Sequence, residues 1–298
     1  MEAERFTVST DGGRQVEVLT AGPASGLPFV MHNGTPGGLV AFGPMVAAAA
    51  ARGLRTVMCA RPGYGASAPW PGRRVADVAG DVAAVLDALG AGEFVTAGWS
   101  GGGPHALACA FLLPGRCLAA VTMAGVAPSR AAGLDWLAGM GPENVEEFTA
   151  AAAGEEPLTR FLAAAADGLR AVSGADVAAA LGGLVGEADR AALTGELAEY
   201  LAASMRAALA GGLAGWRDDD LAFARDWGFA LDAPGGAPVA VWQGDQDMMV
   251  PAAHGAWLAA QVPGARARLL TGEGHLTLAV TSFGEILDDL LSLAGRPG

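Results

Sequence analysis

The chain has 298 residues, of which 52% are hydrophobic and 16% charged, so it can bury a large core and is too apolar to be a disordered chain. Thirty-one acidic against 18 basic residues give a net charge of −13, and every basic residue is Arg. The acidic balance excludes nucleic-acid binding through clustered cations, and the lack of Lys excludes phosphate-loop, Schiff-base and general-base lysines.

Strand and helix signals alternate along the first 125 residues and again after residue 233. Two alternating runs around Asp11-Gly12-Gly13 predict a hairpin, and short apolar runs predict further strands. The predicted strands are 5–10, 15–20, 28–33, 55–60, 93–98, 118–124, 237–243 and 265–271. The predicted helices between them are 39–52, 75–90, 102–113, 252–262 and 282–293. Because most strands are continuous apolar runs, we expect an α/β fold with an eight-stranded, mostly parallel sheet flanked by helices.

Residues 128–233 differ from the sequence on either side. Segments rich in Ala, Leu and Glu predict helices there over 145–153, 158–172 and 190–209, and no run is a convincing strand. A helical insertion between two strands predicts a lid over the carboxyl edge of the sheet. The expected organisation is a core of residues 1–127, a helical lid (cap) of 128–233, and the rest of the core, 234–298. Within the lid, Asp218-Asp219-Asp220 is interpreted as a helix N-cap, or alternatively as a site for a substrate amine.

The cysteines and the N-terminus bear on metals and location. Cys59, Cys109 and Cys117 have no zinc-like spacing, which favours buried thiols in a reducing compartment. Residues 1–10 lack the apolar core of a signal peptide. Residues 94–115 carry no formal charge, but their glycines and prolines favour soluble core over a membrane span. We expect a cytoplasmic protein that binds no membrane.

The motif with the clearest chemical meaning is Gly98-Trp99-Ser100-Gly101-Gly102. A predicted strand precedes it and a predicted helix follows, which is the setting of a nucleophile elbow. The small flanking residues permit a tight turn that lifts the Ser100 hydroxyl above the sheet, and the following helix N-terminus favours developing negative charge. Ser100 is therefore the candidate nucleophile.

A serine nucleophile needs a base and an acid that orients the base. Of the four histidines, His275 lies in a Gly-rich loop just after the last predicted strand and is the candidate base. Asp247, after the strand 237–243, is the candidate acid, and Asp245 in the same turn is the alternative. The remaining histidines receive structural interpretations: His32 braces its loop, His105 lies in or near the core, and His254 is a surface or capping residue.

The Gly34-Thr35-Pro36-Gly37-Gly38 turn follows the strand that neighbours the nucleophile strand. Such a turn suits an oxyanion hole, in which backbone N–H groups stabilise a tetrahedral intermediate. The expected donors are the amides of Thr35 and Gly101, with Gly34 as the alternative to Thr35.

Together these segments resemble the α/β-hydrolase superfamily over the whole chain apart from the lid. Arg61-Pro62-Gly63-Tyr64-Gly65 is similar to the turn after that family's fourth strand, and the Asp247 and His275 loops are similar to its acid and base loops. The resemblance implies Ser100 as nucleophile, His275 as base and Asp247 as acid, with no metal and no organic cofactor. The segment His32-Asn33-Gly34-Thr35-Pro36-Gly37 departs by one residue from the family's commoner pattern. It resembles the esterase and proline-iminopeptidase-like branch.

The expected function is a serine hydrolase that cleaves a carboxylic ester or similar acyl substrate through an acyl-enzyme. The alternatives are a proline-iminopeptidase-like aminopeptidase and a non-catalytic member of the fold that binds a small ligand. The expected partner is a small, apolar acyl substrate, and the sequence is compatible with a homodimer. The candidate pocket residues are Trp99, Trp136, Met140, Trp216 and Trp227.

Overall fold

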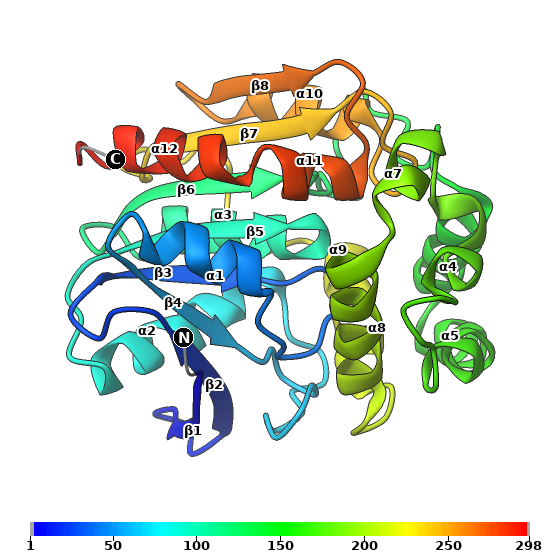
Figure 1. Cartoon of the computed structure of the whole chain (residues 1–298), viewed down its shortest axis with the longest axis horizontal. Helices are drawn as coiled ribbons and strands as arrows, with labels where there is room; N and C mark the ends of the chain where they lie inside the picture. Colours follow the sequence, from blue (N-terminus) through cyan, green and yellow to red (C-terminus); the bar gives the residue numbers. More distant parts are fainter. Residues whose placement is uncertain (1–2, 297–298) are drawn as a thin grey trace.

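An eight-stranded sheet forms the centre of the protein, whose computed structural model describes residues 3–296 (Figure 1). The strands lie in the order β1-β2-β4-β3-β5-β6-β7-β8. The β1–β2 and β2–β4 pairs are antiparallel, and every other pair is parallel. The predicted mostly parallel sheet of eight strands is therefore confirmed. The strands are β1 (Glu4–Ser9), β2 (Gln15–Ala21), β3 (Leu27–His32), β4 (Leu54–Cys59), β5 (Phe94–Trp99), β6 (Cys117–Met123), β7 (Val239–Gly244) and β8 (Arg266–Leu270).

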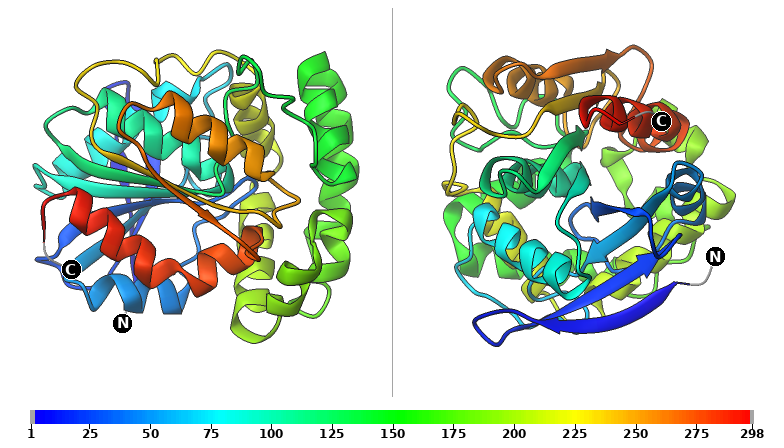
Figure 2. Two further views of the ribbon diagram at one scale, coloured as in Figure 1. Left: turned by 90° about the horizontal axis from the view of Figure 1, so that it is seen from above. Right: turned by 90° about the vertical axis from the view of Figure 1, so that its left-hand side faces the viewer.

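Helices cover both faces of the sheet, as Figure 2 shows from two further directions. Successive side chains of a strand point to opposite faces, so neighbouring residues such as Phe29 and Val30 join two separate hydrophobic clusters. Every residue of the interior strands β5 and β7 is buried, which explains why their sequences are mostly apolar and carry no charge. One face carries α1 (Gly43–Ala50), α11 (His275–Thr281) and α12 (Phe283–Leu293); the other carries α2 (Val78–Ala88), α3 (Gly103–Leu112) and α10 (Ala252–Gln261).

Six further helices lie between β6 and β7 in the chain and stand beyond the carboxyl ends of the parallel strands (Figure 1). We call residues 142–223, which hold them, the inserted segment. The loops at residues 128 and 233, where the lid is predicted to begin and end, lie outside these helices. The helices are α4 (Pro142–Ala153), α5 (Glu155–Leu169), α6 (Val177–Ala180), α7 (Glu187–Ala192), α8 (Gly195–Leu209) and α9 (Ala214–Phe223).

Three helices were not predicted, and one cap prediction is wrong. The short α6 and α11 offer too few turns for a visible period, and α9 is too polar to show an apolar face. Asp218, Asp219 and Asp220 occupy the fifth to seventh positions of α9 rather than its N-cap. All three are buried. Asp219 pairs with Arg61 and Arg73 from a distant segment, whereas Asp218 pairs with Arg217 of the same helix. Within residues 3–296, no helix is both long and apolar enough to cross a bilayer.

Candidate active site

Ser100 lies on a sharp turn between β5 and α3. Its φ of +57° falls in the left-handed region, which is strained for a residue with a side chain. The turn closes tightly, because a Cβ at Gly98 would lie 2.1 Å from the carbonyl oxygen of Gly102. The glycines are therefore required on steric grounds, and the hydroxyl of Ser100 lines a cavity above the sheet edge.

Asp247 and His275 follow the neighbouring strands β7 and β8, and their side chains are hydrogen-bonded to each other. The His275 Nδ1 lies 2.8 Å from Asp247 Oδ2. The other carboxylate oxygen, Oδ1, accepts the backbone N–H groups of Met249 and Val250 at 2.9 and 2.8 Å, and Gln243 Nε2 donates to Oδ2 at 3.1 Å. These bonds hold the carboxylate in one orientation. The carboxylate in turn fixes the imidazole with Nδ1 toward Asp247, which leaves Nε2 able to exchange a proton with another group.

Trp99 supports the buried imidazole from one side. Its ring stacks on that of His275 with centroids 5.8 Å apart, and its Nε1 donates to the His275 carbonyl oxygen at 3.1 Å. Burial lowers the pKa of His275, but the charge and hydrogen bond of Asp247, with a smaller contribution from the charge of Asp189, outweigh it and raise the pKa above its usual value. Within residues 3–296, Ser100 and His275 line the same cavity without a hydrogen bond between their side chains.

The alternative acid and the other histidines lie elsewhere. Asp245 is exposed, and its Oδ1 accepts the Gly272 N–H at 2.8 Å, a bond that lowers the pKa of Asp245 and links the loop after β7 to the loop after β8. His32 is buried at the end of β3, where burial lowers its pKa, and burial also lowers the pKa of His105 to about 4. The surface interpretation of His254 is wrong, since the ring is fully buried and accepts the Ala127 N–H at 3.1 Å.

The predicted oxyanion loop adjoins Ser100. A Cβ at Gly34 would lie 3.3 Å from the Cβ of Ser100, and one at Gly101 would lie 2.5 Å from Thr35 Oγ1. The buried Arg61 fixes the loop, because its guanidinium donates to the carbonyl oxygens of Asn33 and Gly34 at 2.7 and 2.9 Å. The loop and the elbow are thus held in contact.

Asp219 of α9 anchors this loop from the inserted segment, a role that the sequence did not reveal. Its carboxylate is fully buried and accepts hydrogen bonds from Arg61, Arg73, Thr35 Oγ1 (2.8 Å) and Tyr64 OH (3.0 Å). Burial opposes its ionisation, but the two guanidinium groups outweigh burial and hold the pKa of Asp219 well below its usual value. Asp219 lies 158 residues from Arg61 in the chain, so local pattern carries no sign of the pair.

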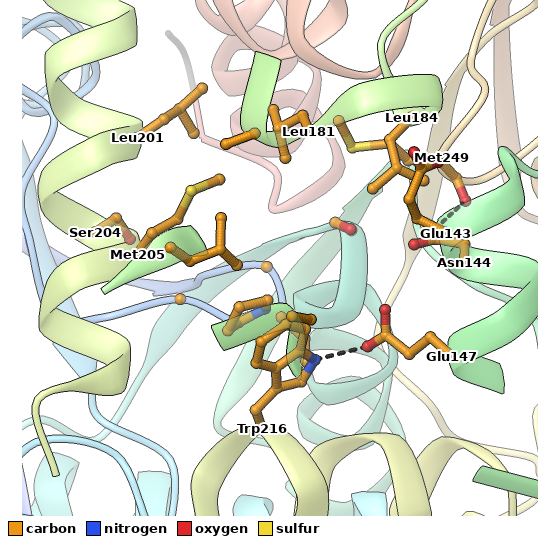
Figure 3. Close-up of a pocket in the computed structure, with 18 of the residues that line it drawn as sticks. Glu143, Asn144, Glu147, Leu181, Leu184, Leu201, Ser204, Met205, Trp216 and Met249 are labelled. Atoms are coloured by element: carbon orange, nitrogen blue, oxygen red, sulfur yellow. Dashed lines mark hydrogen bonds between the residues drawn. The ribbon is translucent and has the colours of Figure 1, made fainter. Parts of the chain in front are cut away.

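A cavity of about 550 Å³ lies between the sheet edge and the inserted segment. Figure 3 shows Leu201, Ser204 and Met205 of α8 facing Glu143, Asn144 and Glu147 of α4 across it. Trp216 of α9 points into the cavity, and its Nε1 donates to Glu147 Oε1 at 2.6 Å. Burial raises the pKa of Glu147 and, more strongly, that of the adjacent Asp220. Within the described residues 3–296, no group of three His, Cys, Asp or Glu side chains is placed to hold a metal ion.

Two of the five predicted pocket residues, Trp99 and Trp216, line this cavity. The other three lie outside it. Trp136 packs edge-on against Phe148 and donates from Nε1 to the Ala127 carbonyl, while Met140 is buried in the loop before α4. Trp227 lines a separate cavity after α9. All three lie in the loops before α4 and after α9, whose course the sequence pattern does not predict.

Comparison with known proteins places these features in a family. Residues 28–280 match the family model described as alpha/beta hydrolase fold. A 124-residue stretch is 35% identical to the non-heme chloroperoxidase of Streptomyces lividans, covering 41% of this chain and 45% of that protein. The chain thus spans less than half the length of this curated relative.

Solved structures extend the likeness to nearly the whole chain. An alpha/beta hydrolase fold protein from Nakamurella multipartita is 26% identical, with a TM-score of 0.62 over 98% of this chain and 100% of that one. A thermophilic esterase from Thermogutta terrifontis is 18% identical, with a TM-score of 0.69 over 98% and 99% of the two chains. The second likeness concerns the fold alone. With a family model matched over most of its length, the chain belongs to the alpha/beta hydrolase fold family.

Proposed function

We propose that the protein is a serine hydrolase that cleaves carboxylic esters, with Ser100 as nucleophile, His275 as base and Asp247 as orienting acid. The observation that carries the proposal is the 2.8 Å bond between His275 Nδ1 and Asp247 Oδ2 beside the cavity that Ser100 also lines. The strained backbone of Ser100 adds support, since strain of this kind concentrates at functional sites. The inserted segment serves as the lid that closes the cavity.

The proposed reaction has two halves. His275 Nε2 takes the proton of Ser100 Oγ as this oxygen attacks the ester carbonyl carbon, and the carbonyl oxygen becomes an oxyanion. The Thr35 and Gly101 amides are the proposed donors to it, each typically worth about 3 kcal/mol. Collapse expels the alcohol, which receives the proton from His275. Water then gives a proton to His275, attacks the acyl-enzyme and releases the acid, and Ser100 regains its proton.

The walls of the cavity favour an apolar acyl group. The inserted segment contributes Leu201 and Met205 on one side and Leu181 and Leu184 on another. Trp99 and Trp216 are the proposed aromatic contacts. A volume of about 550 Å³ suits a small organic molecule.

A fluorophosphonate probe tests the proposal, with the adduct located by peptide mass spectrometry. We expect the adduct on Ser100, its loss in Ser100→Ala, and strongly slowed labelling in His275→Ala. Ser204→Ala is the matched control, because Ser204 lines the same cavity but its hydroxyl accepts the Gly38 N–H instead. Absence of any adduct on folded protein would contradict the proposal and favour a ligand-binding member of the fold.

One observation favours a second candidate, cleavage beside a free amine. Glu143, Glu146 and Glu147 line the cavity, and none of its described lining residues is Lys or Arg. Such a wall attracts an ammonium group and repels a carboxylate. The aspartates of α9, which were the predicted amine site, do not line the cavity.

Matched substrates separate the two candidates. Proline p-nitroanilide and an aminoacyl ester are compared with the isosteric uncharged acyl ester, in the native protein and in Glu143→Gln. The amine-directed candidate predicts a preference for the charged substrates that falls in Glu143→Gln. Equal turnover of charged and uncharged esters, without cleavage of the anilide, would reject it and leave the esterase.

A further inference from the structure

Helix α11 begins with the proposed base and is capped by a residue from a distant part of the chain. The first N–H groups of a helix have no partner within it. Here the carboxylate of Asp189 accepts three of them, from His275 at 2.8 Å, Leu276 at 2.8 Å and Thr277 at 3.0 Å. Asp189 lies in α7 of the inserted segment, 86 residues before His275, and is fully buried.

The neighbouring backbone is shaped to admit this carboxylate. A Cβ at Gly274 would lie 2.4 to 2.6 Å from the three carboxylate atoms of Asp189, so only glycine leaves room for it. The Gly274 N–H is itself bonded to Thr277 Oγ1 at 2.7 Å. The N–H groups of residues 274–277 are therefore all hydrogen-bonded, which restrains the backbone of His275.

Asp189 does not line the cavity that holds Ser100. It contacts the backbone of residues 275–277, and its charge adds a smaller contribution to the raised pKa of His275. The His275 side chain reaches Asp247 at one end and the cavity at the other. The kcat of Asp189→Asn is therefore compared at a pH well above the His275 midpoint, where the base is neutral in both proteins. Small displacements of a base cost large factors in rate, because proton transfer needs the reacting atoms in line.

We propose that Asp189 is a positioning residue for catalysis: from the inserted segment it holds the backbone of the proposed base in register with Ser100. This inference rests on the proposed serine-hydrolase function. It makes the inserted segment part of the catalytic geometry as well as the wall of the cavity.

The test measures kcat per active site for Asp189→Asn, with sites counted by fluorophosphonate titration and a p-nitrophenyl ester as substrate. We expect kcat per titrated site to fall about 10-fold or more, with KM changed by less than about twofold, because Asp189 touches no substrate. Asp77→Asn is the matched control, since Asp77 Oδ2 also accepts a backbone N–H, that of Arg74, and neither residue lines the cavity. A role in folding alone would lower the number of titrated sites and leave kcat per site unchanged, which would overturn the proposal.

A second measurement keeps the proposal separate from the proposed function. Amide hydrogen exchange at residues 275–277 needs no activity, and Asp189→Asn should accelerate it there while Asp77→Asn should not. Gly274→Ala should cause the same acceleration by displacing the carboxylate, and adding Asp189→Ala to it should bring little further change. Unchanged exchange at residues 275–277 in both Asp189→Asn and Gly274→Ala would overturn the inference. Accelerated exchange in a protein that turns over no ester would contradict only the proposed function.

Discussion

Replacing Asp219 by Asn should destabilise the protein more than any exposed charge deletion. The amide would keep the size of the side chain and one acceptor oxygen but remove the charge that faces Arg61 and Arg73. The side chains of these two arginines are 3% and 0% exposed, so water cannot replace the lost partner. Removing one member of a buried ion pair typically costs about 3–5 kcal/mol, because the remaining charge is left uncompensated. With two arginines affected, we expect a loss at the upper end of that range.

Equilibrium urea unfolding of the native protein, Asp219→Asn and a control measures this loss. The control is Asp288→Asn, which breaks a pair with Arg52 whose aspartate side chain is 55% exposed. Exposed pairs typically contribute about 0.2–1 kcal/mol, so this variant should unfold close to the native protein. The same Asp219 variant should also react slowly with the fluorophosphonate, since one amide oxygen must then serve the donors that two carboxylate oxygens share, Thr35 among them. A loss of stability no greater than that of Asp288→Asn would refute the argument.

Three further predictions concern pH and backbone packing. Because the pKa of His275 is raised and the base must be neutral, kcat/KM should rise with pH and reach half its maximum above about 6.5, whereas a midpoint below this value would contradict the Asp247 pairing. The pKa of Asp219 is lowered in the folded protein, so its contribution to the free energy of unfolding should be complete above about pH 4 and lost as the pH falls through the folded-state pKa. The difference in unfolding midpoint between the native protein and Asp219→Asn should therefore shrink only below about pH 4, and a difference that shrinks at higher pH would contradict the lowered pKa. Gly98→Ala should cost about 1–3 kcal/mol or more in thermal or urea unfolding, because its Cβ would meet the Gly102 oxygen, while Gly92→Ala, with open space around it, should cost little; equal effects would count against the tight elbow.

The central sheet was predictable because its strands have a local signature. The runs at β5 and β7 are mostly apolar and uncharged, since both of their faces are buried, and each ends at or near a glycine before the helix that follows. Ser100, Asp247 and His275 could be proposed from the sequence for a related reason. Each follows the end of one of the parallel strands by five residues or fewer, so the sequence predicts that all three lie at the same edge of the sheet.

The contacts of the inserted segment could not be predicted in the same way. Asp189 and Asp219 find partners 86 and 158 residues away, and nothing in their own surroundings distinguishes them from surface acids. The course of the loops and the facing direction of each helix are likewise set by packing. Trp216 of α9 consequently reaches the cavity, whereas Trp136, in the loop before α4, packs against Phe148 outside it. Composition therefore predicts that this part of the chain is helical, but not which of its side chains face the cavity.

The contacts between the inserted segment and the rest of the protein determine what is needed to exchange this segment between related proteins. Most of the apolar wall comes from one continuous stretch, residues 142–223, so a transplanted stretch would change most of the surface that a substrate contacts in a single step. Two of its carboxylates, however, engage the recipient core: Asp189 at the first turn of α11 and Asp219 at Arg61. A chimaera therefore needs an acid at both attachment points. The recipient core needs a glycine at position 274 to make room for Asp189, and arginines at positions 61 and 73 to pair with Asp219.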